Sequence, residues 1–441
     1  MKITQFTMEE VRCFAERQEF EIRPLTFLVG ENSTGKTTML ACFHILAEFL
    51  SGGEVDFNLR PYSMGIFRDI IRRSKKQDKS FALGIRLTDK DDEVDITFGF
   101  AEKPGGVEPV VQSMSIKFSD GEIVLVARER TGGRFEPKAI DEGKNQFHIE
   151  VDSSRLNGGD PFFPLIYFAN NRMDGKSDHN SAFSRFIRGK IEKGISFLNP
   201  GNEPIATVFS TSPVRSQPKR TYDPTREFQD PEGSDVPMML TRIASTKPEE
   251  WERLRQQLIN FGKSSGLFQS IDTEALGSSL GSPFQLKFKV RGPKTNIVDV
   301  GYGVSQILPI LVYILTSSIN ESRRLNQGAG KYFLLQQPEV HLHPKAQAEL
   351  SSLLAQLAST GNHSFMVETH SDNMIDRVRI EIMKGNIKSD DVSLIYLEPR
   401  RNIVKVHNIS IDEMGNLLDV PPNYRKFFFY ESSRLMGFEG T

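Results

Sequence analysis

Apolar and polar positions alternate in a way that predicts strands over much of the first third of the chain. The segments 2–8 and 18–29 show β-type alternation. A helix with one apolar face is predicted from about Thr37 to Leu50. Between residues 80 and 150, five short alternating segments are separated by turn-forming and charged residues, which predicts an antiparallel β layer.

The middle of the chain has a different character. Residues 161–172 predict a buried strand that leads into a polar loop. Residues 175–245 are rich in Pro, Ser, Asn and charge, and this composition predicts a long, mobile surface segment. A helical pattern returns at 248–266.

The last third alternates between helices and strands. Helical patterns follow residues 303–306 and 343–347 and cover 373–385, and β-type segments occupy 331–337, 363–370 and 393–398. Strand and helix in turn predict a parallel sheet with helical crossovers. The predicted fold class is therefore α/β, with a parallel core sheet, an antiparallel β layer and a helical insertion. The predicted parts are an N-terminal lobe (1–150), a helical and irregular insert (151–295) and a C-terminal lobe (296–441).

Composition limits the classes of protein that fit. The chain has 441 residues and a formal net charge of −2, so any nucleic-acid surface must be a local patch. Cys13 and Cys42 form no CxxC pattern, which favours a reducing cytoplasm. No apolar run approaches the roughly 18 residues of a membrane span, and the N-terminus lacks the pattern of a signal peptide. We therefore expect a cytoplasmic protein without membrane contact.

The most specific motif lies between the first strands and the first helix. Residues 30–37, GENSTGKT, match GxxxxGK[ST] in full. Glycines at both ends of the loop allow successive N–H groups to surround an anion. Lys36 adds a cation for the β- and γ-phosphates, and the Thr37 hydroxyl is a ligand for Mg²⁺. We therefore predict that ATP and Mg²⁺ bind here, with the nucleotide held by Gly30, Glu31, Asn32, Ser33, Thr34, Gly35, Lys36, Thr37 and Thr38.

A second anion-binding pattern opens the strongly apolar helix near residue 302. Gly301 and Gly303 precede Ser305 and Gln306, so backbone N–H groups and a hydroxyl are available to an anion. The alternative is an ordinary helix cap at Ser305.

Polar residues end two later strands. The strand at 331–337 ends in two neutral amides, Gln336 and Gln337, and PEVHLHP follows. The alternating His341 and His343 could bind zinc, but no third ligand with metal spacing lies nearby in the sequence. The next strand leads into His370 within VETHSD.

Taken in order, VGENSTGKTT, GYGVSQ, LLQQPEVHLHP and VETHSD resemble the RecF/SMC-like branch of the ABC-type ATPases. More narrowly, they resemble the OLD-like (overcoming lysogenization defect) ATPases. The resemblance covers about residues 1–50 and 295–420. It implies an ABC-type nucleotide-binding domain that forms a homo-oligomer, a head-to-tail dimer or higher. Gly303, Ser305 and Gln306 of one subunit would then cap the γ-phosphate held by the other.

The resemblance also implies partners. Many OLD-like proteins carry a C-terminal Toprim nuclease, and the sequence after residue 400 lacks a DxD-type carboxylate cluster. We therefore expect a separately encoded effector, a nuclease or toxin, with a role in phage defence. The alternatives are a non-hydrolysing nucleotide-gated scaffold and a RecF-like DNA-repair ATPase.

Within the family pattern the amides take the places of acids. Gln336 aligns with the acid of the Mg²⁺ shell, Gln337 aligns with the general base, and His370 aligns with the switch histidine at the γ-phosphate. Loss of a general base typically costs about 10²–10⁴ in rate. Three interpretations stay open: a natural site that relies on Glu339 or His370, an engineered Glu→Gln change that traps ATP, or a switch that hydrolyses very slowly.

Three basic clusters have the composition of a surface that meets a phosphate backbone: 72–79, 185–193 and 213–220. DNA contact is one interpretation of these clusters, and solvated surface charge is the other.

Overall fold

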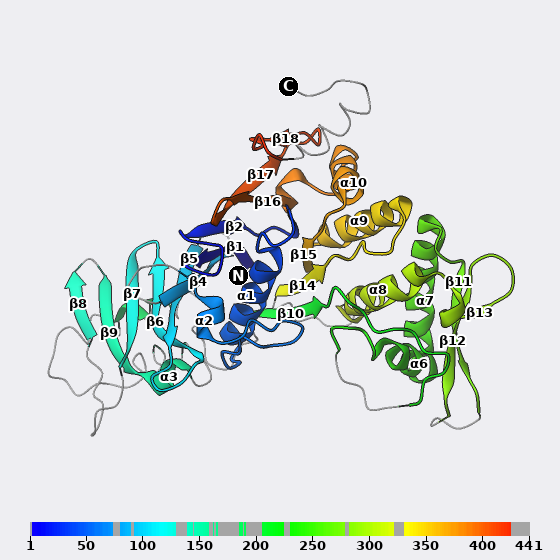
Figure 1. Cartoon of the computed structure of the whole chain (residues 1–441), viewed down its shortest axis with the longest axis horizontal. Coiled ribbons are helices and arrows are strands. Elements are labelled where there is room, and N and C mark those ends of the chain that lie inside the picture. Colours follow the sequence, from blue (N-terminus) through cyan, green and yellow to red (C-terminus); the bar gives the residue numbers. More distant parts are fainter. Residues whose placement is uncertain are drawn as a thin grey trace.

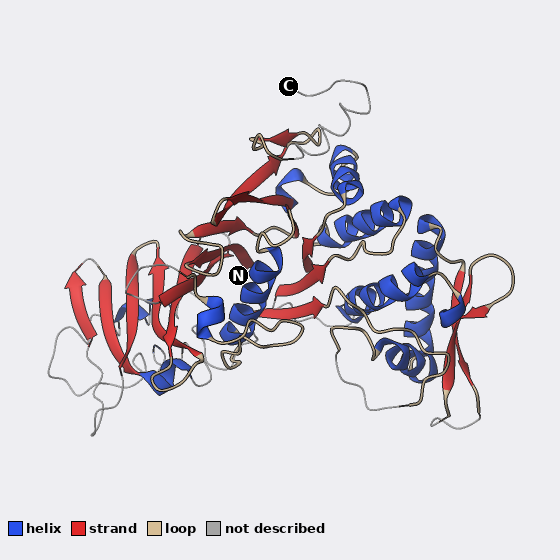
Figure 2. Ribbon diagram, viewed as in Figure 1, coloured by secondary structure: helices blue, strands red, loops and turns tan. Residues whose placement is uncertain are grey.

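The computed structural model describes residues 2–73, 80–89, 92–128, 139–143, 145–157, 185–187, 189–190, 205–224, 230–277, 282–321 and 330–424, together with Phe162 and Leu165. Strands and helices in these residues form a β layer, a central sheet and a helical part (Figure 1, Figure 2). Most of the predicted strand at 161–172 and of the basic cluster at 72–79 lies outside the described residues, as do residues 188 and 191–193 of the cluster at 185–193.

The central sheet has seven strands in the order β10-β14-β15-β3-β16-β17-β18. Their bounds are β3 (Leu25–Gly30), β10 (Ala206–Thr211), β14 (Gly330–Gln336), β15 (His363–Glu368), β16 (Val392–Arg400), β17 (Ile403–Ile411) and β18 (Leu417–Leu418). Neighbours from β10 to β16 are parallel, and β17 and β18 extend the sheet antiparallel. The carboxyl ends of the parallel strands meet at one edge, where ligands bind in open α/β sheets.

The β layer is an eight-stranded sheet in the order β2-β1-β4-β5-β6-β7-β9-β8. Its strands are β1 (Lys2–Glu9), β2 (Gln18–Glu21), β4 (Ser80–Asp89), β5 (Asp92–Glu102), β6 (Pro109–Phe118), β7 (Gly121–Arg128), β8 (Ala139–Gly143) and β9 (Gln146–Asp152). All neighbours are antiparallel except β7 and β9, which pair in parallel because β9 is inserted between β7 and β8. The predicted strand at 18–29 is two strands, β2 and β3, which belong to different sheets on either side of Pro24.

Helices cover both faces of the central sheet. The described helices of at least two turns are α1 (Lys36–Leu50), α6 (Val236–Thr246), α7 (Pro248–Ser265), α8 (Tyr302–Glu321), α9 (Pro344–Ala358) and α10 (Asp372–Met383). Shorter helices are α2 (Phe67–Ile70) and α3 (Ser153–Asn157), and a small antiparallel sheet contains β11 (Ser270–Ala275), β12 (Phe284–Lys289) and β13 (Thr295–Asn296). In Figure 1, α1 lies between the β layer and the central sheet, and α6, α7 and α8 lie beside β11–β13.

Strand β14 is buried on both faces, which explains why its sequence is a continuous apolar run. Tyr332 and Leu334 belong to the core on the α1 side of the sheet. Phe333 and Leu335 belong to the core formed with α7, α8 and α9 on the other side. Alternate side chains therefore bury on opposite faces, as expected for a strand in the middle of a parallel sheet.

The prediction of a mobile surface segment over 175–245 is wrong for 206–211, which form strand β10, and for 236–245, which belong to helix α6. Strand β10 pairs in parallel with β14 at six positions, and all of its residues except Thr207 are buried. Its sequence ATVFST is a β-forming run of only six residues, which the polar composition on both sides concealed. Because β10 belongs to the central sheet, the insert at 151–295 contributes a core strand, and the three boundaries stay a prediction.

Helix α8 corrects the expectation that no apolar run approaches a membrane span. In the described part of the chain, residues Tyr302–Ile319 form a helix that is long and apolar enough to cross a bilayer. This segment is 72% buried inside the protein, where it packs on α6 and α7 and on the central sheet. Its apolar character is therefore explained by burial in a protein core.

The predicted α/β class is confirmed. The parallel core sheet, the antiparallel β layer and the helical insertion are all present, and the phosphate loop lies between a central strand and the helix beneath it. The six elements predicted from residue 303 onwards are also confirmed in type and order.

Candidate nucleotide site

The phosphate loop joins β3 to α1 at the carboxyl edge of the central sheet. Gly30 and Gly35 have φ angles of 151° and 90°, in the region that favours glycine. A Cβ added at Gly35 would lie 2.8 Å from Sγ of Cys13, and one added at Gly30 would lie 2.8 Å from the carbonyl oxygen of Leu397. Both glycines are therefore required by backbone conformation and by close packing, and the loop keeps its concave shape.

Lys36 is buried inside this loop, with 4% of its surface exposed. Its Nζ donates to the carbonyl oxygens of Gly30 at 3.0 Å and Glu31 at 2.7 Å. Burial lowers the pKa of Lys36, and the carboxylates of Glu368, Glu31 and Glu339 oppose that effect. The ammonium group thus lies close to three acids.

The hydroxyl of Thr37 donates to the carboxylate of Glu368, at 2.8 Å to Oε2 and 3.1 Å to Oε1. Glu368 ends β15, is 4% exposed, and pairs with Gln336 in the register of β14 and β15. Burial raises the pKa of Glu368, while the Thr37 hydroxyl and Lys36 oppose the rise. An acid therefore lies directly at the hydroxyl predicted to bind Mg²⁺.

No role was predicted for Glu368 from the sequence. The available signal was its place at the end of an apolar strand, one residue before the Thr369-His370 pair. That signal does not show which strand lies beside the phosphate loop. The pairing of β15 with both β3 and β14 supplies this information.

The two amides at the end of β14 have different surroundings. Nε2 of Gln336 donates to the carbonyl oxygen of Thr211 on β10 at 3.1 Å, and the residue is 3% exposed. Gln337 has a φ of 41°, its N–H donates to the carbonyl oxygen of Glu368 at 2.9 Å, and it lines the cavity beside the phosphate loop. The roles predicted for the two amides stay predictions.

Glu339 lies on the turn that follows these amides. Its Oε1 accepts the backbone N–H of His370 at 2.8 Å, and the residue is 6% exposed. Burial raises the pKa of Glu339, and the N–H of His370 is the first group that opposes the rise. His370 is exposed to solvent on one side, and the partial burial of its ring, followed by the charge of Lys36, lowers its pKa. The predicted catalytic residues Glu339 and His370 are thus in contact.

A cavity of about 420 Å³ opens beside the loop. It is lined by Arg12, Cys13, Asn32, Ser33, Gly35, Lys36, Thr37, Thr38, Gln337 and Glu368. Arg12, for which the sequence predicted no role, donates from Nη1 to the Thr38 hydroxyl at 3.1 Å and from Nη2 to the carbonyl oxygen of Met64 at 3.0 Å. The cavity therefore brings two cations and one acid to the same place.

These residues fit a nucleoside triphosphate with Mg²⁺. The loop offers N–H groups and Lys36 to the phosphates, and Thr37 with Glu368 offers oxygen atoms to a cation. Among the described residues no group of three or more His, Cys, Asp or Glu could hold a metal. This donor set suits Mg²⁺, which keeps several waters and binds through one or two carboxylates and substrate phosphates.

The second anion-binding pattern, at the start of α8, packs against the turn that follows β14. A Cβ added at Gly303 would lie 2.7 Å from the carbonyl oxygen of His341, and the ring of Tyr302 contacts that of His341 edge-on at 4.7 Å. Ser305 is 6% exposed and donates to the carbonyl oxygen of Tyr302 at 2.8 Å, while Gln306 is 2% exposed. None of these residues lines the phosphate-loop cavity of the described chain.

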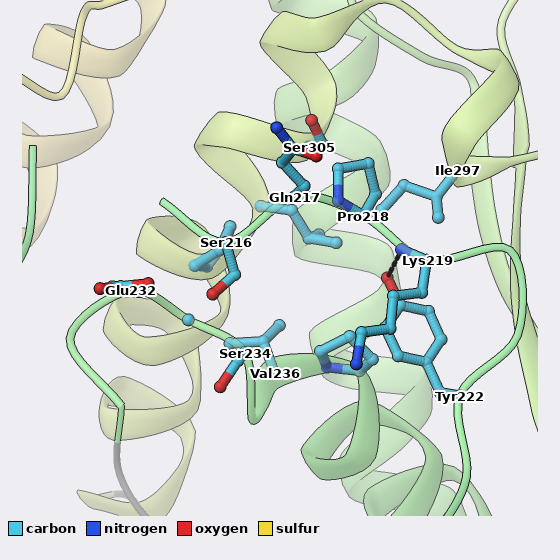
Figure 3. A pocket seen from close by; sticks show the side chains of 14 residues that line it. Ser216, Gln217, Pro218, Lys219, Tyr222, Glu232, Ser234, Val236, Ile297 and Ser305 are labelled. Carbon is cyan, nitrogen blue, oxygen red and sulfur yellow. Dashed lines mark hydrogen bonds between the residues drawn. The ribbon is translucent and has the colours of Figure 1, made fainter. Parts of the chain in front are cut away.

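Ser305 instead lines a second cavity of about 400 Å³. Figure 3 shows Ser216, Gln217, Glu232 and Ser234 among the residues that line this cavity with Ser305. The N–H of Ser216 donates to the carbonyl oxygen of Glu232 at 2.9 Å. Helix α8 therefore begins beside residues 216–219, which were predicted to belong to a surface segment.

The basic cluster at 213–220 does not form a free cationic surface. Arg215 is 2% exposed, and both terminal nitrogens of Arg220 bond to the carboxylate of Asp299, at 2.7 and 2.9 Å. Two of the three cations in this cluster are thus engaged within the protein, which leaves the DNA interpretation of this segment without support from the fold.

Residues 221–375 match the sequence model of a family described as an AAA ATPase domain, and the match supports an ATPase domain in this chain. The fold is similar to an SMC head bound to the C-winged helix domain of ScpA, with 12% identity over 94% of this chain and 99% of that chain and a TM-score of 0.44. It is also similar to the SMC head domain from Thermotoga maritima (9% identity, 93% and 100% covered, TM-score 0.41). A further similar structure is the SMC head domain with an extended coiled coil, bound to the C-terminal domain of ScpA, from Pyrococcus furiosus (11% identity, 98% and 99% covered, TM-score 0.41). No curated protein matches the chain by sequence.

Replacing Gln336 with glutamate is expected to destabilise the protein by about 1–3 kcal/mol. The carboxylate would lose the Nε2 donor to Thr211 and would lie beside Glu368 on the paired strand, where like charges repel. Turnover should stay flat or fall. Urea unfolding and steady-state ATPase assays measure both effects, with Gln356→Glu on the exposed side of α9 as the control. Faster turnover would show instead that Gln336 occupies the place of a lost metal acid.

Proposed function

We propose that this protein is a Mg²⁺-dependent ATPase in which Glu368 on β15 provides the acid that β14 lacks. The observation that carries the proposal is the hydrogen bond of 2.8 Å between the Thr37 hydroxyl and Glu368. It joins the motif residue expected at the metal to a buried carboxylate on the neighbouring strand. Purified protein should hydrolyse ATP only when Mg²⁺ is present. ATP binding without any turnover would favour the nucleotide-gated scaffold.

We assign phosphate binding and cation binding to different residues of the site. Lys36, Arg12 and the loop N–H groups would bind the phosphates, and Thr37 and Glu368 would hold the cation. Mg²⁺, when bound, neutralises developing charge on the phosphate oxygens. In this cavity the phosphate chain would be bound by hydrogen-bond donors that are already in place, so the site would need little reorganisation during the reaction.

Glu339 is the residue we assign as general base. Gln337 is a neutral amide and cannot accept a proton from water. Glu339 is oriented by the N–H of His370, and its burial raises its pKa toward the range in which a base works best. His370 lies close enough to Lys36 to sense its charge, which supports a place for its ring near the γ-phosphate.

The proposed active form is a head-to-tail dimer in which Gly303, Ser305 and Gln306 of one subunit complete the site of its partner. Support comes from the cavity beside the phosphate loop, which Gly303, Ser305 and Gln306 do not line in the described chain. The proposed biological role is control of a separately encoded effector in phage defence, in the cytoplasm. The family resemblance carries that role, and the RecF-like repair ATPase is distinguished from it by turnover that depends on DNA ends.

Mixing two inactive variants tests the composite site. Lys36→Ala removes the phosphate cation, and Ser305→Ala removes the capping hydroxyl while adding no bulk at a buried position. In a head-to-tail dimer both lesions of a mixed pair fall in one site, so the other site is intact. An equal mixture should recover roughly a quarter of wild-type turnover, since half the dimers are mixed and each has one of two sites. A confirmed dimer whose mixtures stay inactive would contradict the composite site.

A further inference from the structure

Residues 212–224, here called the strap, connect the end of β10 to the helical part of the protein. Ser212 and Ser216 donate their N–H groups to the carbonyl oxygens of Pro231 and Glu232, both at 2.9 Å. Tyr222 exchanges backbone hydrogen bonds with Phe284 at 2.9 and 3.0 Å. The strap is therefore fixed along its length by backbone hydrogen bonds.

One strap residue reaches back to the candidate catalytic turn. Nη2 of Arg215 donates to the carbonyl oxygens of Gln336 at 3.1 Å and Gln337 at 3.4 Å. These carbonyls are the last of β14 and the first of the turn that carries Glu339. Arg215 thus contacts the backbone two and three residues before the proposed general base.

The guanidinium of Arg215 is buried in surroundings that disfavour its charge. The side chain is 2% exposed, and its Nε and Nη1 atoms have no hydrogen-bond partner among the described residues. Burial lowers the pKa of Arg215 to about 10, and the carboxylate of Glu339 is the first group that opposes the fall. The guanidinium therefore remains a cation at neutral pH, close to the carboxylate of Glu339.

Stability alone does not account for this arrangement. Each unsatisfied buried donor costs about 1–3 kcal/mol, and an apolar side chain of similar volume would avoid that cost. Incompletely satisfied polar groups of this kind are expected where function requires them. Three other groups lie around Glu339: the cation of Lys36, the backbone N–H of His370 and the carboxylate of Glu368. Arg215 is the one of them that comes from the strap.

We propose that Arg215 is a positioning residue for ATP hydrolysis: it holds the turn from Gln336 to Glu339 and keeps the carboxylate of Glu339 directed at the phosphate-loop site. This inference rests on the proposed ATPase function. It deepens that function by making turnover depend on a contact between the strap and the turn after β14.

A double-mutant cycle between Arg215 and Glu339 tests the proposal. Arg215→Met keeps most of the side-chain volume and removes the charge, and it is expected to lower kcat by about 10- to 100-fold with less than about a 3-fold change in KM. In a Glu339→Gln background the same change should lower kcat by less than about 3-fold, because the group it positions is already lost. Arg215→Lys keeps a charge but not the planar donor geometry, and it should recover part of the lost turnover.

Arg220→Met is the matched control on the same strap. It breaks the ion pair of Arg220 with Asp299 at an exposed position and should leave kcat within about 2-fold of wild type. Thermal unfolding of each variant shows whether it folds. Arg215→Gln, which also removes the charge, replaces Arg215→Met in the cycle if that variant does not fold.

The outcomes separate the two proposals. Equal losses of kcat in the wild-type and Glu339→Gln backgrounds would overturn the positioning role and show that Arg215 acts as a general structural anchor. A loss confined to KM would overturn it as well. Absence of turnover in the unmodified protein, with ATP binding retained, would refute the ATPase proposal and the role of Arg215 in turnover together.

Discussion

Lys36→Ala is expected to weaken ATP binding by about 100-fold or more, since a hydrogen bond to a charged group is worth up to about 3 kcal/mol. The ammonium group lies inside the loop, where it bonds to the carbonyl oxygens of Gly30 and Glu31. Its removal takes away the cation of the loop and also the donor that holds these two carbonyls. Isothermal titration calorimetry with ATP and Mg²⁺ measures the change.

Lys384→Ala provides the control for this experiment. Lys384 follows α10, is 57% exposed in its side chain, and lies only 4.0 Å from Glu381 in a weak surface ion pair. ATP affinity should be unchanged in this variant. If Lys36→Ala also binds ATP normally while remaining folded, residues 30–37 are not the nucleotide site.

Glu368→Gln is expected to lower turnover by about 100-fold and the affinity for Mg²⁺ by about 10- to 100-fold, the range seen when a group that supports a metal is lost. The amide keeps the shape of the side chain and can still accept the hydrogen bond from Thr37. What it loses is the negative charge beside the hydroxyl. ATPase rates measured across a Mg²⁺ titration separate the loss of metal affinity from the loss of rate at saturating metal.

Glu48→Gln is the matched control. Glu48 lies on α1, at the end of the helix opposite to Thr37, and 42% of its side chain is exposed. Its turnover and Mg²⁺ response should equal those of wild type. Binding of ATP in excess EDTA should be similar in Glu368→Gln and wild type, since Lys36 and the loop are unchanged. Normal hydrolysis by Glu368→Gln would remove Glu368 from the site and return the question to the two amides.

Several elements were predictable because their signals are local or periodic. Helix α1 and the strands of the β layer follow from apolar periodicity, and their cores bury the side chains that the periods select. Other elements were not predictable from pattern. Strand β10 is too short to stand out from polar surroundings, and β8 and β9 form a pairing that depends on where β9 inserts. Such choices depend on contacts with distant strands.

The sequence by itself determined the phosphate loop, because its eight residues are contiguous and its chemistry depends on their own backbone angles and side chains. It also determined that polar residues end β14 and β15. Only the tertiary structure decided which acid meets Thr37, since Glu368 lies 331 residues away in the chain. The same holds for Arg215, which reaches Gln336 across 121 residues. Parallel strands are joined by long crossovers, so the order and register that bring these groups together arise from packing on both faces of the sheet.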